Sequence, residues 1–216
     1  TPAQGWEYSI YAYTPLIFWI SIIFSIFIGI TTIFGQIYIG KSYNNNILYG
    51  LVLIILCYVI CLSLYIIRGY YLWNVAGDFA THMSYIKMIL INGHIPNFLF
   101  YPLTHILGAE ISEVSKIPIT TFDKFLPLIF GVMCPLFVYV FAKSVLNNKK
   151  EVIIATILSC AFVSGWYLNF SPNNLANAIF PLILFILFKS IINKNFQWSL
   201  LMVIMIIAYP PFHPIP

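Results

Sequence analysis

Long runs of apolar residues, separated by short polar breaks, make up most of this 216-residue chain. Each run reaches or nearly reaches the roughly 20 residues that an α-helix needs to cross a bilayer. The last run is short, and Pro210 and Pro211 interrupt it near its end. The pattern predicts about six membrane-spanning helices, over residues 15–39, 47–67, 125–146, 152–168, 174–192 and 197–212.

One long segment, residues 68–124, interrupts this pattern and holds most of the acidic residues and histidines. Within it we expect a helix from Asp78 to Ile91, because Gly77 precedes that stretch and Asn92-Gly93 is a helix stop signal. Its apolar residues recur at helical spacing, while its polar residues fall on another face. The predicted apolar stripe is Phe79, Met83, Ile86 and Leu90, and the predicted polar face is Asp78, His82 and Tyr85.

A second amphipathic helix is predicted over residues 103–115, between Pro102 and Pro118. Leu103, Leu107, Ile111 and Val114 form its expected apolar stripe. Helices of this kind lie along a membrane surface with the polar face toward water. We therefore expect both helices to lie flat on the membrane surface, joined by an extended link.

The composition agrees with a membrane protein. Hydrophobic residues make up 61% of the chain and charged residues only 7%, against about a quarter charged in soluble domains. The fold class predicted is all-α: a polytopic transmembrane helical bundle in which residues 1–216 form a single domain and residues 68–124 its first large outer loop. The chain begins with Thr1, so we expect it to be part of a longer protein.

The charges predict an orientation. The connections after the first, third and fifth predicted spans hold six lysines and one acid, whereas the opposite side holds four basic and five acidic residues. The positive-inside rule places the lysine-rich side in the cytoplasm and residues 68–124 on the extracytoplasmic side of the cell membrane. A net charge of +4, carried largely by lysines at helix ends, does not indicate nucleic-acid binding.

Asp78 and His82 are the leading candidates for chemistry. A carboxylate and an imidazole at positions i and i+4 share one helix face, where they can act as a base and its orienting partner or hold a divalent ion. The plainer alternative makes Asp78 a helix cap and His82 a surface residue. Spacing does not decide between the two.

Five further residues are candidate substrate contacts. Arg68 either contacts a phosphate or extends to lipid headgroups, and the same choice applies to Lys87. His94 and His105 are candidate contacts for an acceptor or a phosphate, with a structural role as the alternative. His213 lies among prolines at the end of the last run, where a histidine is costly unless it faces water or a partner.

Residues 68–124 also carry short motifs that suggest a family. An acidic residue, a histidine one turn later, a Gly93-His-Ile-Pro96 turn and a Tyr101-Pro-x-x-His105 segment together resemble the glycosyltransferase C superfamily. The opening Gly5-Trp-Glu-Tyr-Ser-Ile-Tyr11 is similar to a segment of archaeal members. The resemblance covers most of the chain and implies horizontal helices in the first outer loop.

The resemblance implies a membrane glycosyltransferase that moves a sugar from a polyprenyl-phosphate donor to a protein or glycan acceptor. It places the catalytic acid at Asp78, with His82 as its partner and Tyr101 among the substrate contacts. Asp78 then acts as a base or helps to hold Mg²⁺ or Mn²⁺. Family members often have an acidic pair there, and Asp78-Phe-Ala-Thr-His82 departs from that pattern. The alternatives are a multispanning transporter or channel, and a non-catalytic scaffold with the same fold.

Overall fold

The computed structural model describes residues 10–11, 13–39, 45–68, 78–162 and 170–212. All regular secondary structure in these ranges is helical, which confirms the predicted fold class. The helices are α1 (Leu16–Ile39), α2 (Asn45–Arg68), α3 (Asp78–Asn92), α4 (Leu103–Ser115), α5 (Ile119–Val145), α6 (Lys149–Phe162), α7 (Pro172–Asn193) and α8 (Phe196–Ala208).

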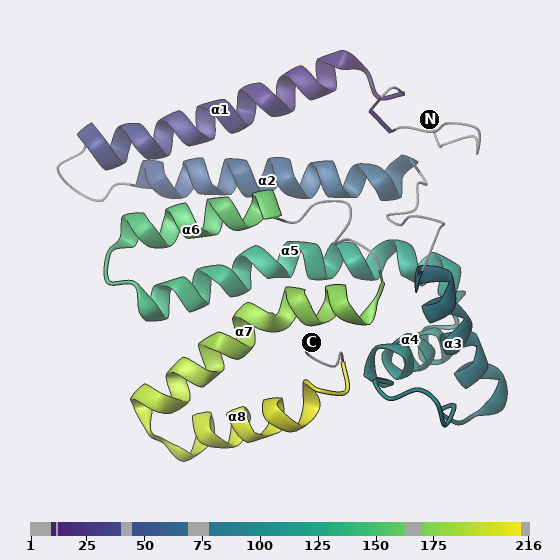
Figure 1. The fold of residues 1–216 in the computed structure, drawn as a ribbon. Coiled ribbons are helices and arrows are strands. Elements are labelled where there is room, and N and C mark those ends of the chain that lie inside the picture. The colour runs from purple at the N-terminus through teal and green to yellow at the C-terminus, as the bar shows by residue number, and fades with distance from the viewer. Residues whose placement is uncertain (1–9, 12, 40–44, 69–77, 163–169, 213–216) are drawn as a thin grey trace.

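Most of the helices lie side by side, and the helices α3 and α4 gather at one end (Figure 1). Helices α1, α2, α6 and α5 run roughly parallel or antiparallel, while α7 and α8 continue the bundle beyond α5. Helices α3 and α4 pack on each other beside the N-terminal end of α5. The ends of α5 and α7 that lead into α6 and α8 lie at the opposite end of the bundle.

Four of the helices are long and apolar enough to cross a membrane: α1, most of α2, the Leu128–Val145 part of α5, and α7. This is the architecture of a membrane protein, but the expectation of about six spans is only partly met. Helix α8 has 13 residues and ends at Ala208, because a proline at 210 and another at 211 cannot continue the hydrogen-bond ladder. Helix α6 has 14 described residues, and the rest of the predicted span at 152–168 lies largely outside the described residues.

Helices α1 and α2 approach each other closely at a pair of glycines. A Cβ atom placed on Gly50 would lie 2.8 Å from the carbonyl oxygen of Gly29, and one placed on Gly29 would lie 3.0 Å from the carbonyl oxygen of Gly50. Small residues let membrane helices pack through their backbones. Around this contact the side chains of α1, α2 and α6 form one buried cluster: Ile33, Ile37, Ile47, Leu51, Ile54 and Ile153.

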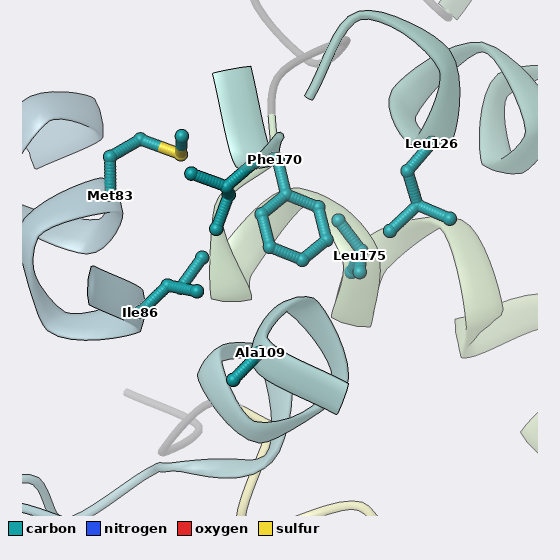
Figure 2. Packing of buried hydrophobic residues seen from close by; sticks show 7 residues of the cluster. Met83, Ile86, Ala109, Leu126, Phe170 and Leu175 are labelled. Carbon is teal, nitrogen blue, oxygen red and sulfur yellow. The ribbon is translucent and has the colours of Figure 1, made fainter. Parts of the chain in front are cut away.

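A second buried cluster joins the short helices to the bundle. Figure 2 shows Phe170, fully buried, between Met83 and Ile86 of α3 on one side and Leu126 and Leu175 on the other. Ala109 of α4 and Ile119 at the start of α5 complete the cluster. The α3–α4 unit is therefore held in place by the packing of Phe170 as well as by chain connection.

The boundaries of α3 and α4 agree with the two predicted amphipathic helices, and their predicted faces agree in part. Met83 and Ile86 of the predicted α3 stripe are buried, and Leu107 and Ile111 of the predicted α4 stripe pack against the same cluster. His82, expected to face water, is only 9% exposed. Val114, expected in the apolar stripe of α4, is 86% exposed, and the buried residues of that helix are Thr104, His105, Gly108 and Ala109. The reason is close packing: a Cβ atom on Gly108 would lie 2.9 Å from both Ile86 and Phe170, so α4 turns its small residues toward its neighbours.

Candidate functional site

Two buried histidines face each other where α3 packs on α4. The Nδ1 atom of His82 lies 2.9 Å from the Nε2 atom of His105, within hydrogen-bonding distance. His105 is completely buried. The pair thus joins the two helices through a polar contact inside an otherwise apolar interface, where a hydrogen bond is worth more than at the surface.

Three aromatic rings surround this pair. Tyr85 of α3 lies 5.5 Å from His105 and 5.3 Å from Phe98, measured between ring centroids. Tyr101 lies 6.4 Å from His82 and 6.3 Å from His105. We call these five residues the aromatic–histidine cluster. Phe98 is 54% exposed and both tyrosines are partly exposed, so the cluster has a buried polar floor and an accessible aromatic rim.

Burial keeps His105 neutral. The pKa of His105 is lowered to about 4, chiefly by loss of hydration and also by the neighbouring His82, whereas a hydrogen bond to the backbone of Tyr101 works in the opposite direction. At neutral pH His105 is therefore an uncharged imidazole. An imidazolium here would have to be buried next to a second imidazole.

The surroundings also favour one tautomer. The Nδ1 atom of His105 is buried without a hydrogen bond of good geometry, and the carbonyl of Tyr101 is the acceptor that bears on its pKa. We therefore assign the proton of His105 to its Nδ1 atom, on the side of Tyr101. The Nε2 atom of His105 then accepts a hydrogen bond from Nδ1–H of His82. The Nε2 atom of His82 then keeps its lone pair and is an acceptor.

The structure brings together three of the candidate residues predicted from sequence: His82, Tyr101 and His105. Lys87 of α3 and His94 of the link to α4 have exposed side chains outside the cluster. His94 has its Nδ1 atom 3.3 Å from the carbonyl oxygen of Ile95, a local contact.

The remaining candidates lie partly or wholly outside the described residues. Asp78 is the first residue of α3 and Arg68 the last of α2, but their side chains are outside the described part of the structure. His213 is outside it altogether. Two residues earlier in the sequence, the carbonyl of Pro211 accepts a hydrogen bond of 3.1 Å from the backbone N–H of Leu103, the first residue of α4.

Sequence reasoning did not pair His82 with His105 and did not single out Phe98. The two histidines are 23 positions apart on different helices, so no local spacing connects them. A weaker signal was present, since each histidine has a tyrosine within one helical turn, His82 with Tyr85 and Tyr101 with His105. Tyr85 lies on α3 and Tyr101 lies just before α4, so the two pairs bring rings from both sides of the α3–α4 contact together.

The described residues fit a metal site poorly. Among them, no three histidine, cysteine, aspartate or glutamate side chains come close enough to hold an ion. The facing nitrogens of His82 and His105 bond to each other, which leaves at most one nitrogen of each ring for another partner. The divalent ion expected from the resemblance therefore stays a prediction that rests on Asp78.

Comparison with known proteins yields no relative: no family model, curated protein or solved structure matches this chain. A functional assignment must therefore come from the residues themselves, and above all from the aromatic–histidine cluster.

Proposed function

We propose that this protein is a membrane glycosyltransferase, which moves a sugar from a polyprenyl-phosphate donor to a protein or glycan acceptor at the outer face of the membrane. The observation that carries the proposal is the aromatic–histidine cluster. It lies on α3, α4 and the link between them at one end of the bundle, and its member His82 is one helical turn from Asp78 in sequence. In the proposed orientation this end of the bundle lies at the membrane boundary, where a lipid-anchored substrate would present its headgroup.

The rim of the cluster suits a sugar. The rings of Phe98, Tyr85 and Tyr101 are partly exposed and offer apolar faces on which the C–H face of a pyranose can stack. Tyrosine hydroxyls can donate to or accept from sugar hydroxyls. The pair of histidines below the rim fixes these rings, because His105 contacts both tyrosines.

The proposed reaction begins at the acceptor hydroxyl. The carboxylate of Asp78 takes its proton, and the acceptor oxygen forms a bond to the anomeric carbon of the donor sugar. The bond from that carbon to the phosphate oxygen breaks, and the polyprenyl phosphate leaves with the electron pair. Arg68 and Lys87 are proposed to stabilise the leaving phosphate, since preorganised charge is usually the largest contribution to such a step.

His82 is proposed to orient Asp78. In the tautomer described above, His82 donates from Nδ1–H to His105, and a proton taken up at Nε2 would make this second nitrogen a donor to the carboxylate of Asp78. A base held in position by a neighbouring ring is a common arrangement in acid–base catalysis. In a metal-dependent form of the reaction, Asp78 would instead hold Mg²⁺ or Mn²⁺, which would offset the charge of the donor phosphate.

The test is donor consumption by the purified full-length protein in lipid nanodiscs, with a radiolabelled polyprenyl-phosphate sugar. Asp78→Asn is expected to lower the transfer rate by at least 100-fold, within the usual range for loss of a general base. The matched control is Glu110→Gln, which removes an exposed carboxylate from α4 and is expected to leave the rate within about twofold.

Full activity of the Asp78→Asn protein would refute the assignment of the base. Failure of the wild-type protein to consume any donor would refute the proposal as a whole, and solute or ion flux in proteoliposomes would then favour the transporter or channel.

A further inference from the structure

A groove at the other end of the bundle is not part of the proposed sugar site. It is a cavity of about 440 Å³ between α2, α5 and α6. Its walls are mainly aliphatic, and the lining residues include Ile47 and Leu48 of α2, Leu136 of α5 and Val152 of α6. From Lys143 at its mouth to Leu136 further in, α5 spans seven residues, or roughly 10 Å along the helix axis.

Two lysines stand at the mouth of this groove. Lys143 belongs to the last turn of α5, and Lys149 is the first residue of α6. The Nζ atom of Lys143 lies 5.9 Å from the centroid of the Tyr139 ring, which also lines the groove. Both cations thus belong to the same opening, on either side of the short connection between α5 and α6.

The other charged residues of this connection point elsewhere. Lys150 donates a hydrogen bond of 2.6 Å to the backbone carbonyl of Ile37, at the end of α1. Glu151 is exposed, accepts a hydrogen bond of 3.4 Å from the side-chain amide of Asn148, and does not line the groove. Among the described residues that line the groove, the charged side chains are Lys143 and Lys149, so cations and no acids line its mouth there.

The groove also opens sideways, toward the surrounding lipid. Leu48 and Val52 on the α2 wall and Leu136 on the α5 wall are each about half exposed. All three are apolar, so a hydrocarbon chain can enter from the bilayer without crossing a polar barrier. The candidate span Leu128–Val145 ends just beyond Lys143, which places the two ammonium groups at the level of lipid headgroups.

From these observations we propose that the groove is a binding site for an anionic phospholipid. One acyl chain lies between α2, α5 and α6, and the phosphate lies between the ammonium groups of Lys143 and Lys149. The cavity volume is within the range of small-molecule sites, and lysines near a membrane surface attract anionic lipid headgroups. The site lies at the opposite end of the bundle from α3 and α4, so it does not depend on the proposed transferase activity.

Native mass spectrometry of the purified protein, titrated with phosphatidylglycerol or phosphatidylcholine, tests the headgroup. We expect one phosphatidylglycerol to bind at least tenfold more tightly than phosphatidylcholine. In the Lys143→Gln/Lys149→Gln protein that preference is expected to disappear. The Lys143→Arg/Lys149→Arg protein should keep it, because the charge is kept. The matched control is Lys189→Gln/Lys194→Gln, which removes two positive charges flanking the α7–α8 connection that do not line the groove.

A second pair of variants tests the acyl chain. Val52→Trp fills the groove from its α2 wall, whereas Leu56→Trp places the same ring one turn further along α2, at a half-exposed position outside the groove. Only Val52→Trp is expected to reduce binding of phosphatidylglycerol, by about tenfold. Circular dichroism and gel filtration establish that each variant is folded. Equal binding of both lipids by the wild-type protein, or unchanged binding by the folded double glutamine variant, would overturn the proposal.

Discussion

His105 links the protonation of a single side chain to the stability of the α3–α4 unit. Burial lowers its pKa to about 4 in the folded protein, from 6.5 for a solvated histidine. Between these values the unfolded chain binds more protons than the folded one, so the free energy of unfolding rises with pH and levels off above about 6.5. We expect lowering the pH from 7.5 to 4.5 to cost on the order of 2 kcal/mol through this residue.

The measurement is thermal unfolding in detergent at both pH values, for the wild-type protein and for His105→Asn. The variant should lose this part of the pH dependence, whatever its stability at neutral pH. His94→Asn is the control, because His94 is exposed and should keep the wild-type slope. An equal slope in the wild-type and His105→Asn proteins would show that His105 is protonated normally.

The candidate site shows what sequence can and cannot predict about single residues. Helical spacing singled out His82, because periodicity places residues of one helix on common faces. The Tyr101–His105 segment was singled out by its resemblance to a family motif. Neither predicted that His82 and His105 bond to each other. That contact depends on how α3 crosses α4, which Gly108 decides by admitting Ile86 and Phe170 at close range.

Whole helices were more predictable than their faces. The second amphipathic helix was predicted over residues 103–115 and is observed over the same residues, because prolines on both sides set its limits. The apolar stripe predicted for it is confirmed in part: Leu107 and Ile111 pack against the buried cluster, whereas Val114 is exposed. In a membrane protein an apolar side chain need not face the protein, since lipid is equally apolar, and small residues often form the helix contact instead.

At the α1–α2 contact, adding one methyl group should lower the stability of the protein. Gly50→Ala would place a Cβ atom 2.8 Å from the Gly29 carbonyl oxygen and 2.7 Å from the Ile33 side chain. The backbone of α1 can relieve this only by moving away from α2. We expect overpacking of about 1–3 kcal/mol to outweigh the gain of up to about 1 kcal/mol from replacing a helical glycine.

Gly35→Ala is the matched control in the same helix pair. A Cβ atom there has nothing within 4 Å, so the substitution should leave the protein as stable as the wild type or slightly more stable. Unfolding in increasing concentrations of sodium dodecyl sulfate ranks the three proteins. If Gly50→Ala unfolds at the wild-type concentration, the helices are not held in backbone contact at this position.

The molecule as a whole has two chemically different ends. The α3–α4 unit with its aromatic–histidine cluster lies at one, and the lysines that flank the α5–α6 and α7–α8 connections belong to the other. Hydropathy predicted the bundle, but four rather than six helices reach spanning length in the described residues. Hydropathy measures apolar length and cannot decide whether a short helix such as α8, with 13 residues, crosses a membrane. The part of the predicted span that follows α6 lies outside the described residues.

The positive-inside rule predicts which end faces the cytoplasm, and cysteine labelling tests it. Single cysteines at Asn97, on the link before α4, and at Asn147, between α5 and α6, are both at exposed positions. They are introduced after replacement of the four natural cysteines. In intact cells a membrane-impermeant maleimide should label Asn97→Cys within minutes and Asn147→Cys only after the membrane is opened.

The labelling result bears on both proposals in different ways. A lipid-linked sugar donor at the outer face requires the α3–α4 unit outside, whereas the phospholipid groove requires only that Lys143 and Lys149 reach a headgroup layer on either side. Labelling of both positions from one side would contradict the odd number of crossings expected between them, since α5 is the one spanning helix in that interval. Reversed labelling would keep the bundle and the lipid groove but exclude sugar transfer at the outer face.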